Sequence, residues 1–455
     1  MLRFRWAILA ILLTTSGGGI ARASTNQHVI LITIDGLAAF YLSDPQASLP
    51  TLRKLAAEGA VADALRVSNP SVTWPNHATL LTGVQPAKHS VLFNGILVRS
   101  GPGEAVRIDG FRDQKDLVPV PMLYDRLHRL GYRTANVNWP CTRGAAGLDD
   151  NFPDVPEQLR HMTSRLRDEL IAARILKDDD DATFRNHSAA ARDEIWTATA
   201  IHLLERRKPN FLMFHLLVTD SIQHLHGPQS AAAYTAVALA DAHLARIVQT
   251  VKNLKLEERT TIFVMSDHGF EKPTKLVNPN VVFRKAGLQR PGRIKVMSIS
   301  EGGTAFVYLT DGATAAADRS QAMELLRGHE GIAQIIGPEG FEALNLPNPS
   351  KNPQMCDLLL VAADGYAFSN ESFDDNSISA LTSAYGSHGY LASNPKMNGV
   401  FVAWGQGIKP GVKLGTVDNI DVAPTIAAVL GEAFPTAEGK PLIRILRTSE
   451  KLNDR

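Results

Sequence analysis

Seven side chains that can bind a divalent metal or attack an electrophile stand near the ends of apolar segments spread along the chain. The set consists of carboxylates, imidazoles and one hydroxyl: Asp35, Asp220, Asp267, His224, His268, His388 and Thr73. Nitrogen and carboxylate-oxygen donors in this number can hold two divalent metals, each with one side open. A hydroxyl beside such metals can be ionised and become a nucleophile. The set therefore predicts a two-metal centre with a nucleophile next to it.

The hydroxyl of Thr73 lies in a stretch that can hold it at the start of a helix. Pro70 and Pro75 flank it and restrict the backbone, and a short apolar run that ends at Gly83 follows. A helix there would direct its free N–H groups and its positive dipole end at Thr73, where an anion could be held. By itself this stretch is also compatible with an ordinary loop and helix cap, so the interpretation depends on the other six residues.

The spacing of the imidazoles and carboxylates favours shared ligation. Asp220-x-x-x-His224 presents two donors from one helical turn, and Asp267-His268 presents adjacent donors after an apolar strand. His388 follows a long intervening segment. Each residue alone is compatible with a structural role, and the nearby His215 and His226 need not be ligands. Their joint occurrence in this order is what indicates a metal site.

Three near-continuous apolar runs predict buried parallel strands. They cover residues 28–34, 211–218 and 261–265. Helical periodicity and shorter strand patterns alternate with them: helices at 50–59, 119–130, 189–207, 231–254 and 422–430, and strands at 133–138 and 399–404. This alternation, with acids after strands, predicts an α/β fold with a doubly wound, mostly parallel sheet whose chemistry lies at the carboxyl ends of the strands.

The sequence texture predicts how the fold is divided. Residues 24–270 and 385–455 carry the alternating pattern and are expected to form the catalytic core. Residues 271–384 combine strand-like and helical stretches and are expected to form a smaller α+β cap insertion. Residues 143–181 are polar and acidic, which suggests surface structure.

The first residues have the pattern of a secretory signal peptide. Arg3 and Arg5 precede a short apolar run, and Ala21-Arg22-Ala23 is a small-residue cleavage site. We expect residues 1–23 to be removed and the protein to be periplasmic or secreted; a retained membrane anchor is the alternative. The apolar run is too short to span a bilayer, and no other stretch is expected to span one.

Charge and cysteine content restrict the function further. The 47 lysines and arginines nearly balance the 46 aspartates and glutamates, so no surface for nucleic-acid polymers or anionic membranes is expected. Cys141 and Cys356 could pair in an oxidising compartment, but two cysteines cannot form a thiolate zinc site. Any metal must therefore use histidines and carboxylates.

These motifs together resemble the alkaline phosphatase superfamily, and within it the nucleotide pyrophosphatase/phosphodiesterase branch. The matching stretches are Ile34-Asp35-Gly36, Thr73-Trp74-Pro75-Asn76-His77, Asp220-Ser221-Ile222-Gln223-His224 with Gly227-Pro228, Ser266-Asp267-His268-Gly269, Ser387-His388-Gly389, and the tail from Asp418 to Ile426. The resemblance implies an alkaline phosphatase-like core. It covers the chain from residue 24 except the insertion and the acidic middle segment.

The resemblance implies two Zn²⁺ sites. One would use Asp220, His224 and His388. The other would use Asp35, Asp267 and His268, with Thr73 bound to it as the nucleophile. In-line attack by Thr73 would form a threonyl-phosphate that water then hydrolyses. Asn94 falls where the branch places an asparagine against a phosphoryl oxygen, together with the N–H that follows Thr73.

The expected substrate is a small phosphate ester, a phosphodiester or a pyrophosphate. Trp74 beside the nucleophile can form an apolar wall of the substrate pocket, or it can simply pack the turn. Trp139-Pro140 resembles a Trp-Pro-Gly stretch of the branch, but Cys141 replaces the glycine, which leaves nucleotide specificity open. The alternatives are a phosphonoacetate-type phosphonate hydrolase, a phosphomonoesterase of the same superfamily, and a zinc-binding protein without turnover.

Overall fold

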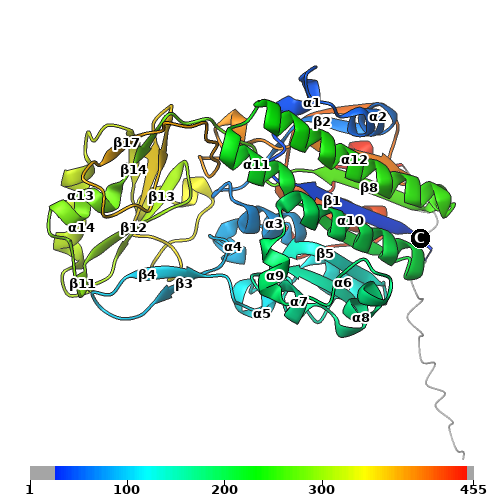
Figure 1. The fold of residues 1–455 in the computed structure, drawn as a ribbon, viewed down its shortest axis with the longest axis horizontal. Helices are drawn as coiled ribbons and strands as arrows, with labels where there is room; N and C mark the ends of the chain where they lie inside the picture. The colour runs from blue at the N-terminus through cyan, green and yellow to red at the C-terminus, as the bar shows by residue number, and fades with distance from the viewer. Residues whose placement is uncertain (1–25, 448–455) are drawn as a thin grey trace, which may run out of the picture.

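The computed structural model describes residues 26–447, and these form a large central sheet with a second lobe beside it (Figure 1). The expected leader, residues 1–23, lies outside the described residues. Eight strands build the central sheet in the order β19-β2-β18-β8-β1-β7-β5-β6. Their bounds are β1 His28–Ile34, β2 Ala60–Arg66, β5 Thr134–Pro140, β6 Asp150–Asp154, β7 Phe211–Leu216, β8 Thr260–Met265, β18 Phe401–Gly405 and β19 Val412–Asp418.

Strand pairing confirms the expected mostly parallel sheet. β1 pairs in parallel with β7 and β8, and β5 pairs in parallel with β7 and β6. The exception in the middle is β18, which runs antiparallel to β8 and β2. Every residue of β1, β7 and β8 is buried, which explains their apolar sequences. Their carboxyl ends meet at one edge of the sheet.

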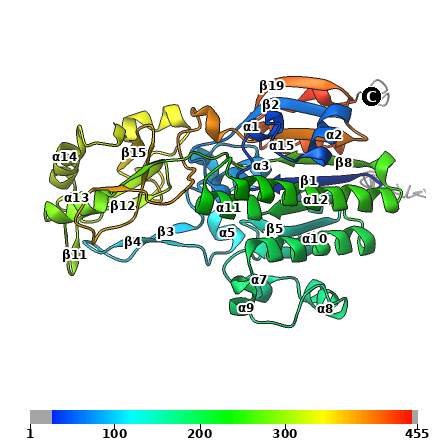
Figure 2. The same cartoon turned by 45° about the horizontal axis from the view of Figure 1, so that its top comes forward.

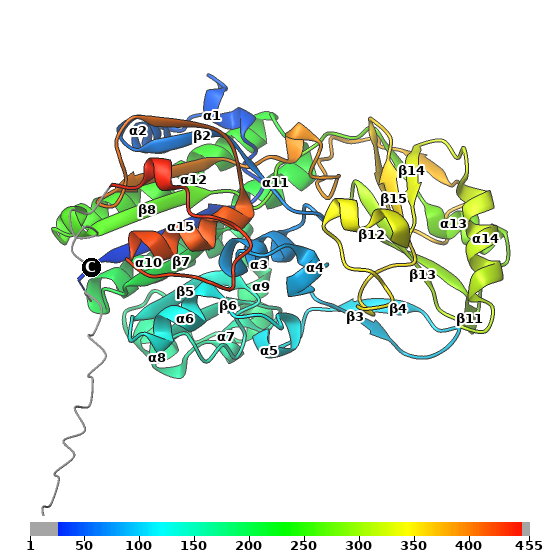
Figure 3. The same cartoon turned by 180° about the vertical axis from the view of Figure 1, so that it is seen from behind.

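Helices cover both faces of the sheet, as a doubly wound fold requires. Figure 1 shows the first face and Figure 3 shows the opposite face from behind. The first is covered by α2 Pro50–Glu58, α8 Ser164–Ala172, α10 Ala189–Arg206 and α12 Ala231–Asn253. The other is covered by α3 Thr73–Thr82, α6 Leu123–Arg129 and α15 Val422–Val429.

Among the described residues, one helix, α12, has the length and apolar composition that could cross a membrane. The sequence-based expectation did not single it out. Its apolar residues Val237, Leu244 and Ile247 are fully buried in the core cluster that lies on the sheet. Asp241 in its middle accepts hydrogen bonds from the N–H groups of Thr51 and Leu52, at 3.0 and 2.8 Å. These contacts are those of a core helix.

The second lobe is built around a four-stranded antiparallel sheet, visible at the left of Figures 1 and 2. It contains β12 Val296–Ser300, β13 Thr304–Leu309, β14 Ile332–Ile336 and β15 Leu358–Ala362, with α13 Pro279–Lys285 and α14 Ala315–Leu326. Smaller strands complete it: β9 Lys275–Val277, β10 Gln289–Arg290, β11 Arg293–Ile294, β16 Tyr366–Phe368 and β17 Ile378–Ala380. This mixed composition agrees with an α+β insertion; the exact boundaries of 271–384 stay a proposal.

A hairpin from the first half of the chain joins the second lobe. Strands β3 Ile96–Arg99 and β4 Val106–Asp109 reach across to it (Figure 2). Leu97 and Val106 are buried in one cluster with Phe306 of β13. The remaining short helices are α1 Phe40–Ser43, α4 Pro86–His89, α5 Gln114–Leu117, α7 Gln158–His161, α9 Asp181–Asn186 and α11 Val218–His226.

Two sequence-based expectations need correction. Residues 143–181 are not surface structure throughout, because β6 is a largely buried strand at the edge of the central sheet. Its polar residues are satisfied by neighbours; for example, Asn136 Nδ2 donates to Asn151 Oδ1 at 2.8 Å. The strand expected at 211–218 ends at Leu216, so Asp220 lies in the first turn of α11. Cys141 and Cys356 are both buried and unpaired.

A buried carboxylate fixes the start of helix α11. Asp193 of α10 is fully buried and accepts hydrogen bonds from the N–H groups of Leu217 and Val218, at 2.9 and 3.0 Å. Burial raises the pKa of Asp193 to about 7 despite these bonds. The same two bonds orient the helix that carries Asp220 and His224.

We predict that Asp193→Ala lowers the free energy of unfolding by about 2–4 kcal/mol, because two buried N–H groups lose their acceptor. Asp193→Asn keeps an acceptor oxygen for only one of the two N–H groups, and it removes the titration. Since the folded pKa lies above the unfolded value, the wild type loses stability as the pH rises from about 4 to about 7. The free energy of unfolding of Asp193→Asn, relative to that of the wild type, should therefore rise over the same range. Urea unfolding at several pH values measures this. A pH-independent difference between the two proteins would contradict the assignment.

Candidate active site

The structure brings all seven predicted side chains together at the carboxyl edge of the central sheet. Asp35 follows β1, Asp267 and His268 follow β8, and Thr73 is the first residue of α3. A cavity of about 160 Å³ opens there. Its lining comprises Asp35, Thr73, Trp74, Asn94, Asn138, Asp154, His215, Leu217, Asp220, His224 and His388.

The first cluster of possible ligand atoms matches the expected nucleophile-side set. Donor atoms of Asp35, Asp267 and His268 lie within 4.8 Å of one another. His268 Nε2 is 3.2 Å from Asp35 Oδ1 and 3.5 Å from Asp267 Oδ2. The Thr73 hydroxyl oxygen lies 3.4 Å from His268 Nε2. A hydroxyl at a helix start therefore adjoins a buried group of one imidazole and two carboxylates.

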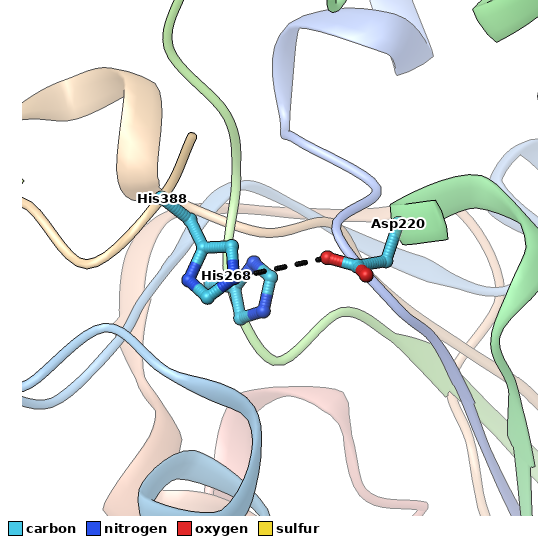
Figure 4. A group of neighbouring side chains, drawn as sticks. All are labelled: Asp220, His268 and His388. Carbon is cyan, nitrogen blue, oxygen red and sulfur yellow. Dashed lines mark ion pairs between the residues drawn. The ribbon is translucent and has the colours of Figure 1, made fainter. Parts of the chain in front are cut away.

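The second cluster differs in one member from the set that the resemblance implied. Asp220, His268 and His388 have donor atoms within 4.8 Å of one another (Figure 4). His388 Nε2 lies 3.8 Å from Asp220 Oδ1, and His224 Nε2 lies 3.3 Å from the same oxygen. The rings of His268 and His388 stack with centroids 3.8 Å apart. His224 is thus beside the cluster, and the two clusters meet at His268.

Three buried carboxylate oxygens indicate whether the site is suited to a metal ion. Asp35 Oδ1, Asp220 Oδ1 and Asp267 Oδ2 are buried and accept no hydrogen bond from any residue between 26 and 447. Buried carboxylate oxygens without donors are costly, and a cation satisfies them. Each of the three is also within 4 Å of an imidazole nitrogen. Oxygen and nitrogen donors directed into one volume fit divalent zinc-type ligation.

Burial and the neighbouring charges shift the pKa values of the aspartates and histidines at this site. Burial opposes ionisation of Asp35, but the adjacent imidazoles of His215 and His268 hold its pKa well below the usual range. Burial and the charge of Asp35 raise the pKa of Asp267 to about 7. Although burial lowers it, the adjacent carboxylates raise the pKa of His268 to about 10. Burial and the neighbouring imidazoles lower the pKa of His388. The carboxylates thus concentrate positive charge where the two clusters meet.

The turn after Asp35 explains the Asp-Gly pair of the first motif. Gly36 has a φ of 66°, and a Cβ there would lie 2.5 Å from the ring of Phe270. Its N–H donates to Asp267 Oδ1 at 3.2 Å, and its carbonyl accepts from Gln223 Nε2 at 2.8 Å. Glycine is therefore required for both the backbone conformation and the close packing that join Asp35 to Asp267.

Asn94 lies against the start of α3, although one expected contact is arranged differently. The N–H of Trp74 donates to Asn94 Oδ1 at 2.9 Å, so this N–H is engaged rather than free for an anion. Because the amide oxygen of Asn94 is used, its Nδ2 is the group left to donate into the cavity. Trp74 both packs the turn and lines the cavity, being 5% exposed.

Sequence reasoning missed two polar groups of this site. His215 was left open as a possible bystander, yet its Nε2 lies 3.2 Å from Asp35 Oδ2. Burial lowers its pKa, but the hydrogen bond to Asp35 prevails and raises it to about 9. A signal was present: Thr33 and His215 interrupt two apolar strands at the same register and bond at 2.9 Å. Asp154 was missed because its segment was assigned to the surface. His226 is exposed and does not line the cavity.

The fold and the site define a member of the alkaline phosphatase superfamily: a doubly wound sheet with clustered carboxylates and imidazoles at its carboxyl edge and a threonine at a helix start. Residues 29–391 match the family described as type I phosphodiesterase / nucleotide pyrophosphatase. The chain belongs to this family, which confirms the resemblance that the sequence motifs indicated.

Individual relatives are distant. Ectonucleotide pyrophosphatase/phosphodiesterase family member 3 of Rattus norvegicus is 25% identical over 248 residues, which are 54% of this chain and 25% of that protein. The bis(5'-adenosyl)-triphosphatase of Xenopus laevis is 21% identical over 418 residues, 90% of this chain and 78% of that protein. The matched part spans only about a quarter of the first relatives' length, including venom phosphodiesterase 2 of Crotalus adamanteus.

Solved structures confirm the fold. Inactive murine ectonucleotide pyrophosphatase/phosphodiesterase 5 in complex with AMP superposes with a TM-score of 0.70 at 17% identity, covering 92% of this chain and 100% of that one. The human protein of the same name gives a TM-score of 0.70 at 17% identity, with 93% and 100% coverage. At this identity the likeness establishes the architecture alone.

We predict that zinc raises the melting temperature of chelator-treated protein by several degrees, because a ligand that binds only the folded state at a hundred times its Kd adds about 2.7 kcal/mol. Differential scanning calorimetry with and without zinc measures the shift. His224→Ala should reduce it, whereas the matched variant His226→Ala, on the same helix but exposed, should keep it in full. A wild-type melting temperature that is indifferent to zinc would contradict the metal assignment.

Proposed function

We propose that this protein is a two-zinc hydrolase that cleaves phosphodiester or pyrophosphate bonds through a threonyl-phosphate intermediate. One observation carries the proposal: the Thr73 hydroxyl lies at the first position of a buried helix, 3.4 Å from the imidazole shared by both clusters of unsatisfied carboxylates. Family membership supports it, since several relatives are named phosphodiesterase or nucleotide pyrophosphatase.

The ligands are assigned by combining the clusters with the family resemblance. Asp35, Asp267, His268 and Thr73 would hold one zinc. Asp220, His224 and His388 would hold the other, and the 3.3 Å approach of His224 Nε2 to Asp220 Oδ1 keeps His224 within reach of this site. Bound zinc would lower the pKa of the nucleophile and offset charge on the departing oxygen.

The protein's own groups determine the course of the reaction. Thr73 Oγ forms a bond to phosphorus while the bond to the leaving alcohol or phosphate breaks in line, and the hydroxyl proton passes to solvent. Asn94 Nδ2 donates to a non-bridging phosphoryl oxygen, where charge is concentrated. Water then cleaves the threonyl ester, which releases a phosphate monoester and restores Thr73. The helix start beside Thr73 favours the anionic phosphoryl group throughout.

The cavity lining favours diesters over the alternatives. None of the described residues that line it is a lysine or an arginine. A phosphomonoesterase needs a cationic clamp for the dianionic phosphoryl group, and a phosphonoacetate-type hydrolase needs a cation for the substrate carboxylate. A zinc-binding protein without turnover would not need a hydroxyl at the position of Thr73. We therefore propose that phosphodiesters are the preferred substrates.

We also propose that the protein acts outside the cytoplasm, in the periplasm or as a secreted enzyme. The support is the naming of relatives as ectonucleotide and venom enzymes. The substrate would be a small molecule. Fractionation of expressing cells tests the location: activity confined to the cytoplasm would contradict the proposal.

We predict that Thr73→Ala lowers turnover of bis-p-nitrophenyl phosphate at least a thousandfold, about 4 kcal/mol of barrier, while most zinc stays bound through the other ligands. Thr73→Ser should keep part of the activity, because the hydroxyl remains but loses the methyl that restricts its rotamer. Steady-state kinetics with parallel metal analysis checks both. Thr82→Ala, at the other end of α3, is the matched control and should remain active. Near-wild-type turnover by Thr73→Ala would overturn the nucleophile assignment.

A further inference from the structure

One wall of the active-site cavity is polar and comes from three elements that the proposed metal ligands do not use. Asn138 lies at an irregular point of β5, with a φ of 59°; Asp154 ends β6, and Gln158 begins α7. Gln158 Nε2 donates to Asn138 Oδ1 at 3.0 Å and to Asp154 Oδ1 at 3.4 Å. Trp74 Nε1 donates to Asp154 Oδ2 at 3.0 Å. These bonds hold the Asp154 carboxyl in one orientation at the cavity.

Asp154 is the one acid of the cavity lining that neither the proposed mechanism nor the ligand sets use. Its hydrogen-bond partners, the indole of Trp74 and the amide of Gln158, are both neutral. Within the described part of the chain, no lysine, arginine or histidine comes within ion-pair distance of it. Arg192 and His215 attract it only from further away, and Asp35 repels it.

A carboxylate in this position has no cation within ion-pair distance, and a ligand that enters the cavity could bring one. Burial raises the pKa of Asp154, which is the response expected of an acid whose charge is poorly compensated. A cation arriving with the substrate would compensate it, and an additional anion would meet repulsion in a volume of about 160 Å³. The indole face of Trp74, fixed by the same hydrogen bond, would also favour a cation.

We propose that Asp154 is a specificity-determining residue that selects phosphodiesters by the charge of the substituent beside the phosphoryl centre. It favours a positively charged substituent, such as an aminoalkyl group, and disfavours a second anion, such as a terminal phosphate or a carboxylate. This inference rests on the proposed phosphodiesterase function and adds the substrate class. It also predicts that polyphosphate esters are poor substrates of this protein, although one relative is named a bis(5'-adenosyl)-triphosphatase.

A matched series of diesters tests the proposal. Propyl, aminoethyl and carboxymethyl esters of p-nitrophenyl phosphate have the same leaving group and similar size, but their substituents are neutral, cationic and anionic. For the zinc-loaded wild type we expect kcat/KM to fall in the order aminoethyl, propyl, carboxymethyl, with about tenfold or more between the two charged esters. Asp154→Asn removes the charge and keeps one acceptor oxygen, which can accept the stronger bond from Trp74 Nε1. This ratio should therefore fall to within about threefold.

Asp63→Asn is the matched control, because it removes one carboxylate from an exposed position on β2 and should leave the ratio unchanged. Circular dichroism and thermal unfolding establish that both variants fold. An unchanged charge ratio in folded Asp154→Asn would overturn the proposal, as would a wild type that prefers the carboxymethyl ester.

A binding measurement separates failure of this inference from failure of the proposed function. Isothermal titration of the three esters into zinc-loaded Thr73→Ala measures affinity without turnover, and the same order is expected there. If the wild type cleaves none of the three esters, the proposed function fails, while the affinities still decide whether Asp154 selects by charge. If the esters are cleaved but bind Thr73→Ala and the double variant Thr73→Ala/Asp154→Asn with identical charge preference, only the role of Asp154 fails.

Discussion

Three aspartate carboxylates crowd into one largely buried volume, and the rest of the structure depends on how their charge is balanced. Each of Asp35, Asp220 and Asp267 keeps one buried oxygen without a hydrogen-bond donor from the described residues. Like charges this close raise each other's free energy, and burial removes the water that would screen them. Imidazoles that interleave with the carboxylates reduce the repulsion but leave those oxygens unsatisfied. Divalent cations would balance both charge and coordination, which is why we propose a two-metal centre.

The doubly wound sheet is what makes such crowding possible. Parallel strands bring their carboxyl ends to one edge, so that Asp35 after β1 and Asp267 after β8 become neighbours although 232 positions separate them in the sequence. α11 then returns across this edge and presents Asp220 and His224 from adjacent turns. The start of that helix is bonded to the buried Asp193, so core packing and site geometry are linked through the same carboxylate.

The second lobe contributes to the site through backbone contacts rather than through ligands of its own. The N–H of Gly303 donates to the His388 carbonyl at 2.8 Å, and Thr304 Oγ1 donates to the Gly389 carbonyl at 2.8 Å. From the other side, His388 Nδ1 donates to the Ser71 carbonyl at 3.1 Å. His388 is thus held between the lobe and the segment that leads to Thr73, so the spacing of the two proposed metal sites depends on both lobes.

Sequence patterns predicted much of this arrangement, for physical reasons. Strands β1, β7 and β8 are mostly apolar because both of their faces are buried, and this made them and the acids after them recognisable. The polar residues around Asp35 were harder to predict. His215 is one polar residue in an apolar strand, and its partner Thr33 is distant in sequence. Asp154 was missed for the opposite reason. β6 is a polar strand, and its side chains form hydrogen bonds with residues that only the folded structure brings close.

The β3–β4 hairpin could not be assigned to the second lobe for a related reason. Its apolar residues are few, and the surface that they cover lies some two hundred positions later in the chain. These two short strands were not predicted from the sequence, because strands with so few apolar residues give a weak periodic signal. Contacts between distant segments are therefore what the sequence pattern leaves undetermined, both here and at Asp154.

Two cations that balance the crowded carboxylates are central to the proposed site. X-ray diffraction from zinc-loaded crystals, collected on both sides of the zinc absorption edge, locates such cations without reference to activity. We expect two anomalous peaks per chain, one among Asp35, Asp267, His268 and Thr73 and the other among Asp220, His224 and His388, separated by about 3.5–4 Å. Crystals without an anomalous peak among these residues, or with peaks only elsewhere on the chain, would contradict the proposed two-metal centre.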